Sequence, residues 1–284
     1  METNILINHF HEAGGSGGLH NELARERLIW INANRCFFAG LTGPPSTRTM
    51  GTILLYVSLG SAVRISIDGG AWEATDAAIV QAYVPHRVAS DDKLVAILHV
   101  EPETVDRASL PCFLKADSGC VVDPALVQRV RTAYEQLTSG DGAVDPRTAD
   151  FDTLFWGRHL APRVIERRIA QVVGWIKHDP CGRLSAADCA TSSGLSVSRF
   201  LHLFKEQTGV PFRSYRTWKR ARSLLYHVTK SANLAYLALD VGYPDSTHLS
   251  HVVRQVYGMT PTALFKGCLT MRMYGHSVPA PCAI

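Results

Sequence analysis

Two segments in the second half of the chain repeat one local pattern, and this repeat constrains the fold more than any other feature. In each, a glycine stands where a tight turn between two helices needs a positive φ, and an apolar residue, a polar cap and an amphipathic helix follow. The segments span 184–205 and 233–254, and their turn glycines, Gly194 and Gly242, lie 48 residues apart. A single pattern of this kind is weak evidence. Two of them predict a helical domain with two helix-turn-helix units.

The stretch between the two units predicts a linker helix from about Pro211 to Val228. One face is apolar, and basic residues populate the rest: Arg213, Arg216, Lys219, Arg220 and Arg222. A helix of this length spans about 26 Å, which permits two recognition helices near the ~34 Å repeat of adjacent major grooves. An earlier amphipathic helix is predicted to begin near Pro162 and to end before Pro180.

Charge is divided unequally along the chain. Residues 1–155 carry 12 Lys and Arg against 19 Asp and Glu, a net charge of −7, whereas residues 156–284 carry 17 against 6, a net charge of +11. A basic half of this size favours a polyanionic partner, with nucleic acid the first candidate. A basic surface without such a partner is the alternative that charge alone leaves open.

The first half has the pattern of a β-rich domain. Short runs rich in β-branched residues lie at 53–57, 63–67, 78–80 and 94–100. Turn residues such as Asp68-Gly69-Gly70 separate them, so the spacing predicts a sandwich or a small barrel. A helix with one apolar stripe is predicted over 124–137.

Nine short motifs of the second half occur in one family with the same order and spacing. They are Gly194-Leu195-Ser196, Arg199-Phe200, Phe204-Lys205, Thr208-Gly209-Val210-Pro211-Phe212, Arg220-Ala221-Arg222, Leu224-Leu225, Val241-Gly242-Tyr243, His248-Leu249-Ser250 and Tyr257-Gly258-Met259-Thr260-Pro261. Through them, residues 161–266 resemble the DNA-binding domain of the AraC/XylS family of transcription regulators. The first half resembles the cupin-like effector domain of the same family more loosely.

The resemblance implies an α+β chain of two domains. An N-terminal antiparallel β, cupin-like barrel plus a helix would bind an effector and dimerise, and an all-α C-terminal domain would hold two helix-turn-helix motifs joined by a linker helix. The expected boundaries are 1–137 for the effector domain and 161–267 for the DNA-binding domain. The break at Thr138–Gly142 indicates a linker over 138–160, and a flexible tail that contains Pro279 and Pro281 is expected over 268–284.

By motif position, the resemblance places the DNA-binding candidates on the helix that follows each turn. They are Ser196, Ser198, Arg199, Leu201, His202 and Lys205 in the first unit, and Ser246, Thr247, His248, His251 and Arg254 in the second. Arg199 is expected to contact a base or a phosphate. Leu201 contacts a thymine methyl or packs in the core, and Lys205 and Arg254 are phosphate contacts or plain surface charges. His248 and His251 are left between DNA contacts and structural roles.

The same resemblance makes Arg48, His86 and His99 candidates for the effector pocket. Arg48 would be the clamp for an anionic group, because a guanidinium binds carboxylate or phosphate in a bidentate manner. The alternative for each of the three is a surface or ion-paired residue.

The implied partners are double-stranded promoter DNA, a small-molecule effector, RNA polymerase and a second copy of the chain in a homodimer. Activation and repression both stay open. No apolar stretch approaches the ~18 residues of a membrane helix, and the start lacks a signal pattern, so we expect a cytoplasmic protein without a membrane role. No cofactor and no metal are expected.

Two alternatives belong to other functional classes. A DNA-tethered cupin enzyme would need two histidines and a glutamate near Thr47–Tyr56, which holds no His, Glu or Cys. A covalent or redox sensor would use Cys36, Cys112 or Cys120, although none of the seven cysteines forms a C-x-x-C pair and inert buried thiols are favoured. The sequence therefore favours a regulator over an enzyme.

Overall fold

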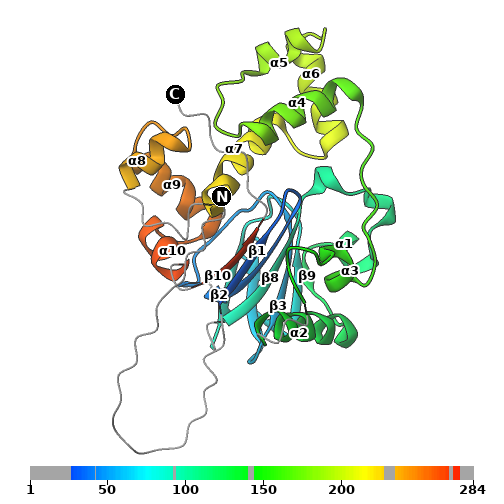
Figure 1. The fold of residues 1–284 in the computed structure, drawn as a ribbon, viewed down its shortest axis with the longest axis vertical. Coiled ribbons are helices and arrows are strands. Elements are labelled where there is room, and N and C mark those ends of the chain that lie inside the picture. Colours follow the sequence, from blue (N-terminus) through cyan, green and yellow to red (C-terminus); the bar gives the residue numbers. More distant parts are fainter. Residues whose placement is uncertain are drawn as a thin grey trace, which may run out of the picture.

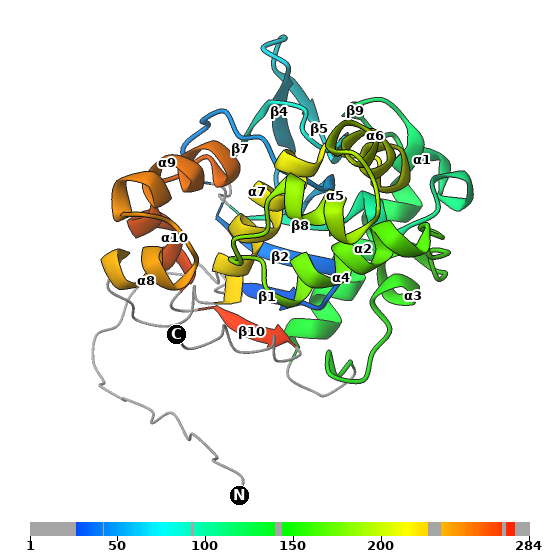
Figure 2. The same ribbon diagram turned by 90° about the horizontal axis from the view of Figure 1, so that it is seen from above.

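The fold comes from a computed structural model, which describes residues 27–41, 43–91, 94–139, 144–226, 234–268 and 271–275. A β-rich N-terminal part lies below a helical C-terminal part, and one helix, α7, runs between them (Figure 1). Seen from above, the helices form two groups on either side of α7 (Figure 2). Within the described residues, no helix has the length and apolar character needed to cross a membrane.

Ten strands form two sheets. Their bounds are β1 Leu28–Ile31, β2 Arg35–Leu41, β3 Ile53–Ser58, β4 Val63–Ile67, β5 Glu73–Thr75, β6 Ala77–Val80, β7 His86–Ser90, β8 Leu94–Val100, β9 Gly119–Cys120 and β10 Arg272–Gly275. The larger sheet has the order β10-β1-β2-β8-β3-β6-β9 and the smaller one the order β5-β4-β7. In β4, Arg64 is exposed between buried Val63 and Ile65, whereas Ser66 is buried and Ile67 half-buried, so the strand does not alternate along its whole length.

The expected β domain is present, but it is an open arrangement of two sheets and not a closed barrel. Among the described strands, none is hydrogen-bonded into both sheets, so the ladder does not close. The larger sheet instead ends on β10 at one edge and on the two-residue strand β9 at the other. Short or covered edges of this kind limit unwanted strand pairing without closure.

Helix α2, Pro124–Thr138, covers one face of the larger sheet. Pro124 occupies the first turn, and the Asp123 side chain caps it by accepting a hydrogen bond from the Leu126 N–H. The apolar stripe of α2 is buried in this domain's own core. The expected linker is partly helical as well: α3, Phe151–Trp156, buries Phe155 and Trp156 in the same core.

The C-terminal part consists of seven α-helices in the described residues. They are α4 Arg167–His178, α5 Ala186–Ser192, α6 Val197–Thr208, α7 Phe212–Ser223, α8 Leu234–Asp240, α9 Ser246–Tyr257 and α10 Pro261–Cys268. Short helical turns elsewhere are η1 Pro102–Thr104, η2 Arg107–Ser109, α1 Cys112–Lys115 and η3 Leu224–Tyr226. The pairs α5–α6 and α8–α9 are the two predicted helix-turn-helix units.

Several predicted boundaries differ from the structure. The helix expected from Pro162 begins only at Arg167, where Glu166 caps it, and Val164 is almost fully exposed. The linker helix is α-helical for 12 residues and then tightens into η3, so its regular part spans about 18 Å. Its predicted end at Val228 lies outside the described residues.

The C-terminal tail is the largest correction. It was expected to be flexible from residue 268, but Arg272–Gly275 forms β10, which pairs in parallel with β1. Met271 and Met273 pack against one apolar cluster of the molecule and Tyr274 against another. The edge of β1 supplies hydrogen-bond partners that the tail sequence alone does not reveal. Residues 276–284 lie outside the described part.

Candidate DNA-binding faces and effector pocket

The first helix-turn-helix unit follows the predicted local chemistry. Ser185 and Asp188 form a reciprocal capping box at the start of α5. Gly194 makes the turn with φ +64°, and the Ser196 hydroxyl caps α6 by accepting from the Arg199 N–H. On α6, Phe200 is buried while the candidate residues are all exposed: Ser196, Ser198, Arg199, Leu201, His202 and Lys205. The exposure of Leu201 excludes the core-packing alternative for that side chain.

The second unit is built in the same way. Gly242 has φ +74°, and a Cβ there would come within 3.0 Å of the Cys181 carbonyl oxygen. Asp245 caps α9, and Leu249 and Val253 are fully buried. Thr247, His248, His251 and Arg254 are exposed and Ser246 is half-buried. The structure therefore gathers the second set of candidates on one helix face, and their DNA contacts stay a prediction.

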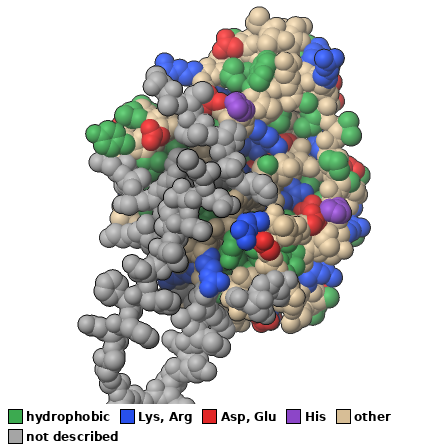
Figure 3. All heavy atoms as spheres, viewed as in Figure 1, with side chains coloured by type: hydrophobic (Ala, Val, Ile, Leu, Met, Phe, Trp, Pro, Cys, Tyr) green, Lys and Arg blue, Asp and Glu red, His purple; other side chains and the backbone are tan. Residues whose placement is uncertain are grey.

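Basic side chains do not gather into a single patch on the face of the molecule drawn in Figure 3. On the face drawn in Figure 3, Lys and Arg are spread over both parts of the chain with Asp and Glu among them. The candidate DNA surface is therefore defined by the exposed faces of α6 and α9 and not by charge density on this side.

A buried ion cluster, which the sequence did not reveal, fixes α7 to the β-rich part. Glu101 and Glu103 follow β8 and are almost completely buried. Glu101 forms ion pairs with Lys219 and with Arg222, the latter at 2.9 Å, and Glu103 pairs with Lys219 at 2.6 Å. Burial raises the pKa of Glu101, but Lys219 and Arg222 outweigh it and hold that pKa below its ordinary value. Both carboxylates face cations of the linker helix.

Aromatic residues of α7 complete this contact. Trp218 donates from Nε1 to Glu101 at 3.3 Å, and the Tyr215 hydroxyl donates to Glu103 at 3.3 Å. The Trp218 ring stacks on His99 and packs so closely on Gly51 that a Cβ there would lie 2.4 Å from the ring. Glycine is therefore required at position 51 for α7 to dock.

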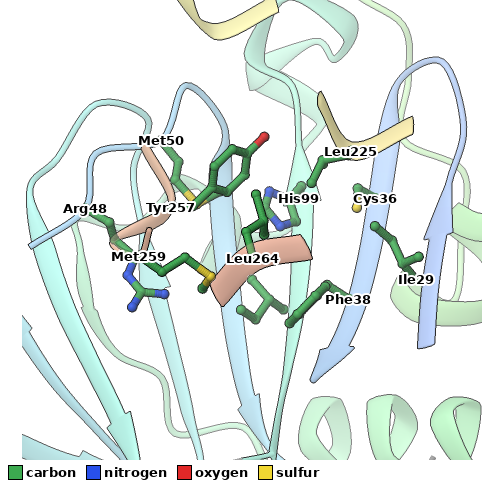
Figure 4. Close-up of a pocket in the computed structure, with 11 residues that line it drawn as sticks. Ile29, Cys36, Phe38, Arg48, Met50, His99, Leu225, Tyr257, Met259 and Leu264 are labelled. Atoms are coloured by element: carbon green, nitrogen blue, oxygen red, sulfur yellow. The ribbon is translucent and has the colours of Figure 1, made fainter. Parts of the chain in front are cut away.

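Beside this contact lies a small cavity of about 40 Å³ whose walls come from both parts of the chain (Figure 4). The lining residues are Ile29, Cys36, Phe38, Arg48, Met50, Ile97 and His99 from the β-rich part, and Leu225, Tyr257, Met259 and Leu264 from the helical part. This volume is far below the ~300 Å³ of a typical ligand site. Residues of α9 and α10 and of the segments next to them form the far wall of the cavity.

Arg48 and His86 are held together beneath α9. Their backbones exchange two hydrogen bonds, at 2.9 and 3.0 Å. The His86 ring lies 3.0 Å from the Val84 carbonyl at Nδ1 and 2.6 Å from the Tyr56 hydroxyl at Nε2, which sets Nδ1 as donor and Nε2 as acceptor. Burial lowers the pKa of His86 to about 4 and raises that of Tyr56 to about 12. Burial also lowers the pKa of Arg48.

His99 lies on β8 at the cavity wall. Its Nδ1 is 3.2 Å from the Thr52 hydroxyl. Burial, with a contribution from Arg222, lowers its pKa to about 3. Arg48 and His99 therefore both line the cavity, whereas His86 lies outside its lining and is joined to Arg48 through the backbone. Tyr56 and Ser46 belong to the same group, and nothing in their local sequence pattern marked them.

The cysteines and acidic groups bear on two other kinds of chemistry, thiol reactivity and metal binding. Cys36 is buried at the cavity wall, and Cys112 and Cys120 are exposed. Burial and the nearby Glu73 raise the pKa of Cys120, which disfavours its thiolate. In the part of the chain that the structure describes, no three His, Cys, Asp or Glu side chains are arranged to hold a metal ion.

Comparisons with known proteins agree with this geometry. A family profile described as "Helix-turn-helix domain" matches residues 189–267. The arabinose operon regulatory protein of Escherichia coli (strain K12) is 27% identical over 106 residues, which are 37% of this chain and 36% of that protein. The match thus spans about a third of the curated relative.

Solved structures extend the likeness to the whole fold. The apo form of a ToxT point variant from Vibrio cholerae superposes with a TM-score of 0.54 at 12% identity, covering 85% of this chain and 96% of that one. A second ToxT structure from Vibrio cholerae gives a TM-score of 0.53 at 8% identity, covering 82% and 98%. Identity this low shows a shared fold only. The C-terminal part of the chain therefore resembles the DNA-binding domain of AraC-type transcription regulators, and the two-part fold is shared with ToxT.

Proposed function

We propose that the chain is a sequence-specific DNA-binding transcription regulator, controlled by a small effector bound between its two parts. The DNA-binding role is supported by one observation: α6 and α9 each have one buried apolar face and one exposed polar face. Each helix buries an apolar stripe and exposes polar and basic side chains at the positions that enter a major groove in helix-turn-helix proteins. Double-stranded promoter DNA is the proposed partner, because its major groove admits a helix and its phosphates attract basic side chains.

The effector half of the proposal rests on the cavity. Its walls are almost entirely apolar, and Arg48 provides a cation at one end. Burial disfavours the charged form of Arg48, and an anion beside it would offset that cost. An apolar molecule with one carboxylate therefore fits this site best. Since the cavity is only about 40 Å³, such a ligand must push α9 and α10 away from the sheet, which links occupancy to domain arrangement.

RNA polymerase contact and homodimer formation remain expectations from the family resemblance. The helix expected to mediate dimerisation, α2, buries its apolar stripe against its own sheet. Its exposed residues are small or polar: Pro124, Ala125, Gln128, Arg129 and Glu135. A homodimer through α2 would therefore be a polar contact.

DNA selection followed by fluorescence anisotropy tests the DNA-binding role. A specific site should be enriched from random DNA, and the full chain should bind it at least 1,000-fold more tightly than a scrambled version. Arg199→Ala should cost about 1–3 kcal/mol on the selected site if it contacts a base. Lys205→Ala is the matched control, because losing a phosphate contact should weaken all sequences equally and reduce the salt dependence. Equal wild-type binding to both sequences would reject the proposal.

Calorimetric titration with decanoate, an apolar carboxylate, tests the effector role. We expect binding to the wild-type chain and at least a tenfold loss in Arg48→Met, whereas Arg64→Met, at an exposed arginine of the same domain, should bind normally. Binding that Arg48→Met does not change would place the ligand elsewhere. Decanol is the matched ligand, since it keeps the chain and lacks the charge.

A further inference from the structure

The C-terminal end of the recognition helix α9 is held by a segment of the β-rich part. The last carbonyls of a helix lack partners within the helix. Here the Thr49 N–H donates to the Gln255 carbonyl at 2.9 Å, and the Ser46 hydroxyl donates to the Gly258 carbonyl. Two hydrogen bonds from residues more than 200 positions earlier therefore satisfy this helix end.

Arg48 lies between these two contacts. Gly258 ends α9 in the left-handed conformation, φ +69°, and a Cβ there would lie 2.9 Å from Arg48 Nε and 2.9 Å from Ser46 Oγ. The arginine therefore packs directly on the helix terminus, where the carbonyl ends of the helix dipole favour a positive charge. The same side chain lines the cavity (Figure 4).

Recognition helix α6 ends in a comparable way but with a different partner. It also has a left-handed glycine, Gly209, with φ +80°. The guanidinium beside it belongs to Arg163, which donates to the Glu206 carbonyl at 3.0 Å. Arg163 precedes α4 and is part of the helical domain itself. The C-terminal end of the first recognition helix is therefore held from within the helical domain, and that of the second by the β-rich part.

We infer that Ser46–Thr49 is the positioning element through which the cavity acts on DNA reading, and that it acts on α9 and not on α6. An anion that draws Arg48 into the cavity removes a positive charge from the end of α9 and shifts the two hydrogen bonds beside it. The effect on the second helix-turn-helix unit is direct, whereas the first unit has no such contact with this segment. This inference rests on the proposed function and specifies how its effector site is coupled.

Hydrogen–deuterium exchange on the full-length chain tests the coupling without DNA or effector. Ser46→Ala and Arg48→Met should each raise exchange at the last turn of α9 about fivefold, equivalent to about 1 kcal/mol, and leave α6 unchanged. Arg163→Met is the matched control and should show the reverse pattern. An unchanged α9, or equal changes in α6 and α9, would overturn the inference. Ser46→Ala removes a single hydroxyl, so the test does not depend on Arg48→Met folding well.

A DNA readout separates positioning from general destabilisation. On the selected site, Ser46→Ala should reduce discrimination against base changes in the half read by α9, by about fivefold, and keep discrimination in the half read by α6. A uniform loss over both halves would mean that Ser46 acts only through stability and would overturn the inference. A wild-type chain that selects no site at all would instead refute the DNA-binding proposal, and the exchange data would still decide the coupling.

Discussion

The two helix-turn-helix units share their turns and caps but differ in what surrounds them. The fully buried core of the first unit consists of residues between 169 and 215 in the helical part, and Tyr83 of the β-rich part packs against its edge. The second unit has no separate core: Leu249 and Val253 belong to one apolar cluster with strand residues such as Ile29 and Ile97. Similar local patterns have therefore produced one nearly self-contained reader and one that is continuous with the effector domain.

This difference indicates which helix-turn-helix unit a change in the effector domain can affect. A unit with its own core keeps its structure when its neighbour moves. A unit that shares its core with the cavity wall cannot, because separating the two parts exposes apolar surface of both. The predictions below, from the largest expected effect to the smallest, test this contrast.

Removing a core side chain should raise hydrogen exchange over a smaller part of the chain in the first unit than in the second. Phe200→Ala should destabilise the first unit by about 3–5 kcal/mol and raise exchange only within 169–215. Leu249→Ala should cost about 2–5 kcal/mol and also raise exchange in β2 and β8. Leu201→Ala, on the exposed face of α6, is the control and should change stability by less than about 0.5 kcal/mol. A sheet unaffected by Leu249→Ala would mean that the second unit is also independent.

The buried ion cluster lies between the two units and should be the next most sensitive point. Glu101→Gln removes the carboxylate that pairs with Arg222 and should lower the free energy of unfolding by about 3 kcal/mol. We do not expect a larger loss, because Glu103 still pairs with Lys219. Asp91→Asn breaks an exposed pair with Arg64 and should cost less than about 1 kcal/mol. Urea denaturation of both variants measures the difference. Equal small effects would show that the cluster does not hold α7.

Acid should loosen the second unit through the histidines beneath it. The pKa of His86 is lowered to about 4 and that of His99 to about 3, so both stay neutral in the folded chain while the unfolded chain binds protons below pH 6.5. Unfolding therefore becomes easier as pH falls from 6.5 toward 4, by up to about 1.4 kcal/mol per pH unit for each ring. We expect a loss of about 2 kcal/mol between pH 6.5 and 5.5. His99→Gln should remove about half of that pH dependence, and an unchanged dependence would contradict this origin.

The sequence predicted the parts of the fold that depend on local chemistry. Gly194 and Gly242 mark the two turns because left-handed backbone strongly favours glycine, and Ser185 marks a helix start because its hydroxyl accepts from the first turn. The family resemblance brought Arg48, His86 and His99 together as candidates; the structure places Arg48 and His99 in the cavity lining and His86 beside Arg48, outside that lining. Their binding role stays a prediction.

The parts that the sequence did not predict depend on residues far away in the chain. Lys219 and Arg222 belong to a basic helix face of the kind that normally faces water. Their burial is made favourable by Glu101 and Glu103, more than a hundred residues earlier, and by the Asn32 and Arg35 carbonyls that accept from Arg222. Strand β10 forms because the edge of β1 is available to pair with it. Neither partner can be recognised from the local pattern.

The smallest predicted effects concern the helix starts, where the two units should behave alike. Ser185→Ala and Asp245→Ala each remove a side chain that accepts a backbone N–H in the first turn, so each should cost about 1 kcal/mol in urea denaturation. Both caps are exposed and come from within the unit that they serve. If Asp245→Ala lowers the free energy of unfolding much more than Ser185→Ala does, the second unit also depends on the start of its recognition helix. The difference between the two units would then not be confined to the C-terminal end of α9. Equal costs would leave that end, held by Ser46 and Thr49, as the point where the two readers differ.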